Sequence, residues 1–209
     1  MTPDRYHHGD LPNALRHAAA DVIAEDGLGR FSLREVARRA GVSHTAPAHH
    51  FGDVRGLLTS LAVEGFDHLY EASTAAVGTE SDPAERLAVM GEAYVAIATD
   101  HPAHCQVMFR TDVVDPDDPT LLEAGMRAHG VLRDTIRDLV EAEGLHVDID
   151  VAAELCWAAM QGLVVLAPKL ALVDAAHGVE PPSMRVRVRR LTRLMLDGIR
   201  HADGPTGRT

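Results

Sequence analysis

Histidine, cysteine and aspartate are the side chains in this sequence that could bind a metal ion. His101, His104 and Cys105 place nitrogen and sulfur ligands within one helical turn, as zinc sites do. No second cluster completes a tetrahedral site, so ordinary surface histidines are the favoured interpretation. The three aspartates of the 115–118 loop lack the glycine and the bidentate glutamate of a calcium loop. We therefore predict no metal site and no cofactor.

Enzyme signatures are missing as well. The chain has no glycine-rich phosphate loop and no Gly-x-Ser-x-Gly elbow, and neither Cys105 nor Cys156 has a nucleophile motif around it. These two cysteines form no disulfide framework, which fits a reducing compartment. The apolar run Leu163 to Ala167 is far shorter than the ~20 residues that span a bilayer. We expect a cytoplasmic protein with no catalytic residue and no membrane partner.

Two short helices joined by a glycine turn are expected in the first third of the chain. Ser32 and Glu35 form a Ser-x-x-Glu capping box at the start of the first helix, and Gly41 ends it. Ser43 is expected to cap the second helix, over 44–51. The inward face is supplied by Leu33, Val36, Ala37, Ala40 and Val42. This pattern is typical of a helix-turn-helix, which reads the major groove of DNA, and also occurs as a plain scaffold.

Polar side chains outside this core are suited to contact DNA. Imidazole and hydroxyl groups bond to base edges and phosphate oxygens, and free N–H groups at Ser43 can hold a phosphate. The expected contact residues are Arg34, Ser43, His44, Thr45, Ala48, His49, His50 and Arg55. Arg38 is a further candidate for the DNA backbone. For His50 the alternative is packing against the neighbouring Phe51.

The net charge is unevenly distributed. The whole chain carries −11, which by itself argues against a nucleic-acid partner. Residues 1–60, however, contain seven arginines and seven acidic residues, whereas residues 61–209 contain 13 basic and 24 acidic residues. The neutral part can approach phosphates, and DNA repels the acidic remainder. Arg5 is another possible contact, and His7 and His8 form either an ordered arm or the start of the first helix.

Helical spacing of apolar residues continues through the rest of the chain, and no stretch alternates as a β-strand does. We predict an all-α fold of about nine helices. An N-terminal helix-turn-helix domain is expected over 9–69, with its motif at 32–51. A C-terminal helical domain for effector binding and dimerisation follows over 82–201, and residues 202–209 are expected to form a disordered tail.

A specific pattern is carried by SLREVARRAGVSHTAPAHHF over 32–51, by Tyr-His-His-Gly-Asp-Leu from residue 6 and by Leu57-Leu58. On these residues, 6–69 resemble the DNA-binding domain of TetR-type (TetR/AcrR) transcriptional regulators. CWAAMQGL over 156–163 is similar to a Trp-x-x-x-His-Gly motif in the C-terminal domain of one branch of that family. The resemblance implies a DNA-binding regulator.

Three positions depart from the family pattern. Ala48 stands where members usually have a tyrosine, and Val54 stands where they usually have a lysine. In those members the tyrosine and the lysine commonly touch the DNA backbone. Gln161 replaces the histidine of the C-terminal motif. Loss of phosphate contacts weakens binding to all sequences alike and leaves base discrimination in place. Arg55 is placed to compensate for Val54.

A dimer is expected because one short recognition helix covers only a few base pairs. The resemblance implies that the last two helices form a four-helix interface with a second copy. The expected interface residues are Ala158, Ala159, Gly162, Leu166, Val188, Leu191 and Met195. Burial of the last helix's apolar stripe inside the chain is the alternative.

An adaptable apolar set in the middle helices is suited to line a pocket, although such residues more often form plain core. The set is Met90, Tyr94, Met108, Phe109, Leu132, Ile136, Trp157 and Met160. Arg110 or His129 is expected to meet a polar group of the ligand. The resemblance implies a small, largely apolar effector of unknown identity.

The favoured function is a homodimeric repressor that binds a palindromic DNA operator and is released by this effector. Two alternatives stay open. One is a helical ligand carrier or interaction module whose DNA surface has decayed, as Ala48 and Val54 suggest. The other is a metal-dependent enzyme built on His101, His104 and Asp115.

Overall fold

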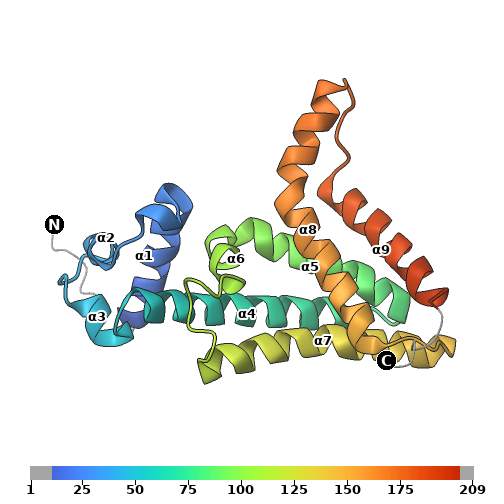
Figure 1. The fold of residues 1–209 in the computed structure, drawn as a ribbon, viewed down its shortest axis with the longest axis horizontal. Coiled ribbons are helices and arrows are strands. Elements are labelled where there is room, and N and C mark those ends of the chain that lie inside the picture. The colour runs from blue at the N-terminus through green and yellow to red at the C-terminus, as the bar shows by residue number, and fades with distance from the viewer. Residues whose placement is uncertain (1–10, 203–209) are drawn as a thin grey trace. The chain divides into compact units, whose positions relative to one another are not determined.

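The computed structural model describes residues 11–202, and every regular element in that range is a helix (Figure 1). The elements are α1 (Leu11–Asp26), the 3-10 helix η1 (Leu28–Arg30), α2 (Leu33–Arg39), α3 (Ala46–Phe51), α4 (Val54–Gly78), α5 (Pro83–Asp100), α6 (Pro102–Met108), α7 (Pro119–Glu143), α8 (Ile149–Ala176) and α9 (Met184–Arg200). The predicted all-α fold is confirmed. Arg5, His7, His8 and the predicted tail from residue 203 lie outside the described residues.

Most helix ends follow local sequence signals. The Ser32 hydroxyl accepts a hydrogen bond from the Glu35 N–H at 3.3 Å, as expected for the cap of α2. The exception is α3, which begins at Ala46 with Thr45 as its N-cap residue, later than the expected start at residue 44. The reason is Pro47, because a proline without an N–H is tolerated only in the first turn. Ser43 therefore caps nothing.

The chain forms two compact units. Unit 1 contains the described residues up to Phe66 together with His101–Gly125, and unit 2 contains Asp67–Asp100 and the described residues from Met126 onward. Helices α4 and α7 contribute to both units, and α6 with the loop after it belongs to unit 1. The ranges 9–69 and 82–201 remain a sequence-based prediction of functional domains.

The core of unit 1 holds the helix-turn-helix together. It is built from the buried residues Leu15, Ala18, Ala19, Val22, Val36, Ala40 and Leu57. Leu33, Val42 and Phe51 pack against this core, so α2, the turn and α3 are each attached to it. Full burial of one such leucine or valine stabilises the fold by ~1.5–3 kcal/mol. The recognition helix α3 has only six residues, and this packing compensates for its shortness.

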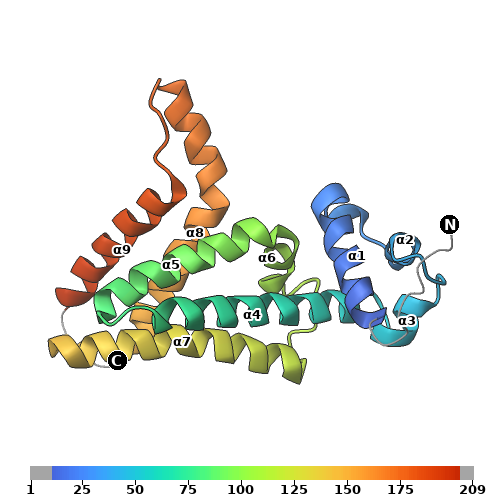
Figure 2. The same cartoon turned by 180° about the vertical axis from the view of Figure 1, so that it is seen from behind.

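The core of unit 2 lies between α5, α7, α8 and α9, with α9 packed mainly against α5 and α8 (Figure 2). Gly91 permits the close approach of α5 to α9. A Cβ at this position would lie 3.0 Å from Val188 Cγ1 and 3.1 Å from Met160 Sδ. Val188 is fully buried in this contact, and Met195 is buried too. The apolar stripe of α9 therefore serves the chain's own core.

Helix α8 is long and apolar enough to cross a membrane by length and composition alone. An 18-residue window within it has a mean hydropathy of 1.6, and 22% of that window is buried in the chain. The expectation from the sequence rests on unbroken apolar runs, whereas this helix qualifies by its mean hydropathy over 18 residues. One helix of this kind is weak evidence for a membrane. Its apolar face is nevertheless largely exposed in the single chain.

Candidate nucleic-acid interface and effector cavity

The residues expected to contact DNA are all exposed on unit 1. They are Arg34 on α2, Ser43, His44 and Thr45 in the turn, Ala48, His49 and His50 on α3, and Arg55 at the start of α4. Arg34 and His44 line one surface hollow, and the rings of His49 and His50 lie 5.5 Å apart between centroids. The turn and α3 thus present imidazole and hydroxyl groups on one short stretch of surface. The Ser43 and Thr45 hydroxyls bond to each other at 3.1 Å.

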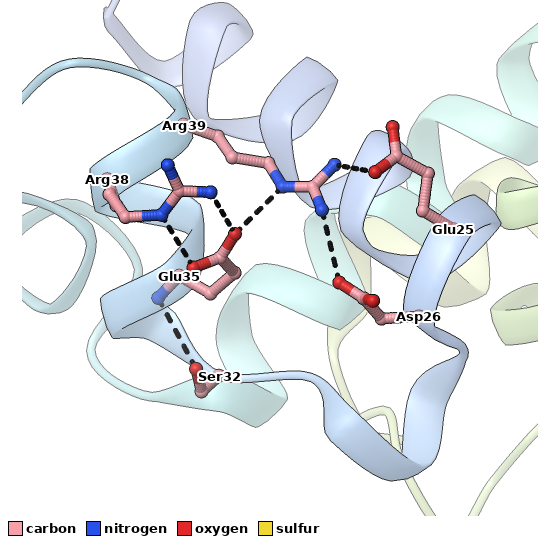
Figure 3. Close-up of polar contacts among 6 residues, drawn as sticks. All are labelled: Glu25, Asp26, Ser32, Glu35, Arg38 and Arg39. Atoms are coloured by element: carbon pink, nitrogen blue, oxygen red, sulfur yellow. Dashed lines mark hydrogen bonds and ion pairs between the residues drawn. The ribbon is translucent and has the colours of Figure 1, made fainter.

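Ion pairs on α2 remove two arginines from the free positive charge of this face (Figure 3). Arg38 donates two hydrogen bonds to the Glu35 carboxylate, at 2.8 and 2.6 Å. Arg39 binds Glu35 at 3.0 Å and also pairs with Glu25 and Asp26 at the end of α1. The hydrogen bonds from Arg38 and then Arg39 lower the pKa of Glu35 to about 2.

This network ties α2 to α1 and leaves little cationic charge for DNA. Glu35 is the shared anion, so the charge of Arg38 is largely neutralised where it stands. Arg34, by contrast, has no ionic partner among the residues that the structure describes. It is therefore the guanidinium of α2 best suited to meet a phosphate.

Arg55 does not take the place of the missing lysine at position 54. Its guanidinium donates to the Val114 carbonyl at 2.6 Å and to the Asp112 carbonyl at 3.3 Å. The Thr59 hydroxyl accepts from the Asp115 N–H at 2.8 Å and fixes the same loop. The expectation that Arg55 compensates for Val54 is therefore corrected, because this side chain holds the loop between α6 and α7.

A cavity of about 50 Å³ lies within unit 2, between α4, α5, α7, α8 and α9. Six of the ten expected pocket residues line it, namely Met90, Tyr94, His129, Leu132, Trp157 and Met160. Ile136 is fully buried core. Met108, Phe109 and Arg110 belong to unit 1, where the Arg110 guanidinium is paired with Asp112, so placing these four residues in the pocket is corrected.

Several cavity residues were missed by sequence reasoning. They include Leu69, Ser73, Gly91, Cys156, Thr192 and Met195. Leu69 and Ser73 lie on α4, where Leu69 ends the predicted DNA-binding range 9–69 and Ser73 falls before the predicted effector domain begins at residue 82. The one sequence signal for these cavity residues was a small residue, Gly91, on an otherwise apolar helix face. Met195 was expected at a dimer surface but lies inside.

Two of the side chains that line the cavity, Tyr94 and His129, are held by neighbouring side chains. The Tyr94 hydroxyl donates to Gln161 Oε1, so the glutamine that replaces the family's histidine has a defined partner. The His129 ring stacks against Trp157 with 5.0 Å between centroids. Burial lowers the pKa of His129, and the charge of Arg133 lowers it further. The cavity therefore favours a neutral imidazole.

The residues considered as metal ligands or nucleophiles are not arranged for either role among the described residues. His104 is buried, and its Nε2 lies 3.4 Å from Glu64 Oε2. Within the described range no group of three histidine, cysteine, aspartate or glutamate side chains is arranged to hold a metal ion. Burial raises the pKa of the Cys105 and Cys156 thiols to about 11, which keeps them protonated and poorly nucleophilic.

The fold and the exposed turn define the class of this protein, a helix-turn-helix DNA-binding protein with a helical second unit. Two family models agree. The model for bacterial regulatory proteins of the tetR family matches residues 15–61, and the model for the Tetracyclin repressor-like C-terminal domain matches residues 87–180. The chain belongs to the TetR family, whose members are DNA-binding transcriptional regulators and not enzymes.

Solved structures share the fold over nearly the whole chain. A protein with unknown function from Rhodococcus sp. RHA1 is 28% identical, with a TM-score of 0.79 and coverage of 95% of this chain and 100% of that one. The TetR family regulator PfmR from Thermus thermophilus is 21% identical, with a TM-score of 0.70 and coverage of 88% and 98%. FadR from Bacillus subtilis, in complex with stearoyl-CoA, is 15% identical, with a TM-score of 0.67 and coverage of 90% and 98%. No curated protein matches the chain.

Proposed function

We propose that this chain is a cytoplasmic, homodimeric repressor that binds a palindromic operator and is released by a small, largely apolar effector. TetR-family regulators are typically DNA-binding repressors with a ligand-binding C-terminal domain. The observation that carries the proposal is the exposed turn and α3, whose imidazole and hydroxyl groups stand over a well-packed core. Because α3 is so short, base readout needs a second copy on the same operator.

The face available to a second copy differs from the one expected. Val188 and Met195 are buried, and Ala159 and Leu191 pack against the core of unit 2. These four residues therefore leave the proposed interface.

The exposed apolar residues of the last two helices include Val151, Leu155, Leu166, Leu172 and Val173 on α8 and Val186 and Leu194 on α9. Ala158 is exposed and Gly162 half-buried, at helical spacing between Leu155 and Leu166. Exposed apolar side chains repeated along one face of a helix are typical of an interaction site. We therefore place the dimer interface on this face, defined by Leu155, Ala158, Gly162, Leu166 and Leu194.

Helix α4 offers a route from effector to DNA. It contributes Leu57 to the core under the helix-turn-helix and Leu69 and Ser73 to the cavity. A ligand that widens the cavity favours a different position of α4 and so lowers the population of the DNA-binding state. The cavity, at about 50 Å³, is far below the ~300–1,000 Å³ of drug-sized ligand sites. This supports an effector much smaller than the stearoyl-CoA bound by Bacillus subtilis FadR.

DNA binding is tested with a duplex from the region upstream of the chain's own coding sequence, by fluorescence anisotropy at several salt concentrations. We expect salt-sensitive binding, and we expect His44→Ala or Thr45→Ala to cost ~1–3 kcal/mol per half-site if the side chain reads a base. His146→Ala, an exposed histidine of unit 2, is the control and should bind normally. Absence of salt-sensitive binding to any palindromic fragment would favour a ligand carrier with a decayed DNA surface.

A further inference from the structure

One buried hydroxyl in the cavity wall is not used by the protein. Thr192 on α9 is 3% exposed, and its Oγ1 has no hydrogen-bond partner among the residues that the structure describes. Thr192 lines the cavity. Its Oγ1 is 3.7 Å from the position of a Cβ on Gly91, another cavity residue. The hydroxyl therefore lies on the cavity side of α9.

Three other threonines within helices of this chain behave differently. The hydroxyls of Thr59, Thr99 and Thr135 each donate to the backbone carbonyl four residues earlier, at 2.8, 2.9 and 2.8 Å. This bond is the usual way for a helical threonine to satisfy its hydroxyl. Thr192 does not make the equivalent bond to the Val188 carbonyl. A buried polar group without a partner is costly to the fold, which makes a functional use of it the natural explanation.

The rest of the cavity wall determines the kind of group that can bind beside Thr192. The lining is mainly apolar and contains no arginine, lysine, aspartate or glutamate. The lining contains one histidine, His129, and burial lowers its pKa and so favours the neutral imidazole. A charged ligand group would lose its hydration here without gaining a counter-ion. The neutral hydroxyl of Thr192 can either donate or accept one hydrogen bond.

We infer that Thr192 anchors the effector, and that the effector is a compact, uncharged, mostly apolar molecule with one hydrogen-bonding group directed at this hydroxyl. The inference rests on the proposed effector function of the cavity and names the class of ligand that it takes. The cavity of about 50 Å³ is smaller than the ~150 Å³ cavity that holds benzene, so even a one-ring ligand enters only as Met90 and Met160 adjust around it. Anchoring on α9 also places the ligand on a helix whose opposite side carries the exposed Leu194.

Binding of toluene and phenol to the full chain tests this inference, because the two probes differ only by a methyl in place of a hydroxyl. Thr192→Val keeps the side-chain shape and removes the hydroxyl. Thr135→Val is the matched control, since Thr135 is equally buried in unit 2 but bonds to Val131 and lies outside the cavity. Calorimetry gives the dissociation constants, and sodium benzoate serves as a charged probe of similar size.

The wild type should bind phenol about five- to tenfold more tightly than Thr192→Val does, as the loss of one neutral hydrogen bond implies. Toluene should bind both proteins equally, within twofold, and Thr135→Val should match the wild type. Benzoate should bind at least tenfold more weakly than phenol. Unfolding temperatures measured without probe verify that each variant is folded, and Thr192→Val should unfold at a higher temperature than the wild type.

Two different failures are distinguishable. If toluene binds but the phenol affinity is unchanged by Thr192→Val, the anchoring role of Thr192 is overturned while the cavity remains a ligand site. Benzoate binding as tight as phenol binding overturns the uncharged class. If neither toluene nor phenol binds the wild type, the inference and the effector part of the proposed function both fail. DNA binding, measured on the same preparation, reports separately on the repressor role.

Discussion

Single side chains decide how much positive charge this protein offers to DNA. The sequence places four arginines near the recognition helix, but Glu35 neutralises Arg38 and shares Arg39. Arg55 is bound to a loop of its own unit. Arg34 is thus the main cation of the face among the described residues, and we expect imidazole and hydroxyl groups to supply the remaining contacts. Affinity for nonspecific DNA should accordingly be low.

Replacement of Glu35 tests this interpretation. Glu35→Gln releases Arg38, while Arg39 keeps Glu25 and Asp26. We expect tighter binding to all DNA sequences at low salt, with the slope of log K against log salt steeper by about one unit. Glu25→Gln, which changes the charge equally but leaves Arg38 paired, should have little effect on this slope. Equal slopes for Glu35→Gln and the wild type would show that Arg38 does not reach phosphate.

His129 makes stability depend on pH in a defined direction. Its pKa in the folded chain is lowered from 6.5, chiefly by burial, so the unfolded chain binds the proton more tightly. The contribution of neutral His129 to the free energy of unfolding is therefore present above pH 6.5 and is lost as the pH falls toward its folded pKa. We expect His129→Gln to lose less stability than the wild type between pH 7.5 and pH 5.5 in urea titrations. His146→Gln, at an exposed site, should behave as the wild type does.

At the scale of helices, the sequence predicts where several helices begin, but it does not predict which face of a helix packs against which neighbouring helix. The cap at Ser32 and the proline-marked starts of α5 and α6 depend on a few neighbouring residues, so the sequence sufficed to place them. The two faces of α9 could not be told apart in that way. Val188 and Leu194 are both apolar, yet one is buried against α5 and the other is 69% exposed. Only the tertiary arrangement decides this, and the same holds for the α4 residues in the cavity.

The contact of α5 with α9 depends on Gly91, and its substitution should show this. Gly91→Ala places a methyl 3.0 Å from Val188 Cγ1 and 3.1 Å from Met160 Sδ, tighter than ordinary packing. We expect a loss of ~1–3 kcal/mol in the free energy of unfolding and weaker binding of toluene and phenol alike. Gly130→Ala, on α7 with open space around it, should instead stabilise by up to ~1 kcal/mol through helix propensity. Similar effects of both variants in denaturant titrations would contradict the close contact.

At the scale of the whole molecule, the net charge of −11 is unevenly distributed, and the two parts of the chain are suited to different roles. The neutral N-terminal part can meet phosphate, and the acidic remainder is repelled by DNA and carries the cavity and the apolar face of α8 and α9. We expect weak nonspecific affinity, which would make the protein dependent on two half-sites bound together. The central claim is therefore that two chains, joined through that face, occupy one palindrome.

A charged side chain in place of Leu194 tests this claim most directly. The measurement is analytical ultracentrifugation, first of the chain alone and then of the chain with an operator duplex. We expect the wild type to sediment as a dimer and to place two chains on one duplex. Leu194→Glu should sediment as a folded monomer with at least tenfold weaker operator affinity, because a buried unpaired carboxylate opposes association. Met126→Glu, at a 68% exposed apolar residue of α7, should remain dimeric. A Leu194→Glu protein that still forms the dimer and the two-chain complex would contradict the account.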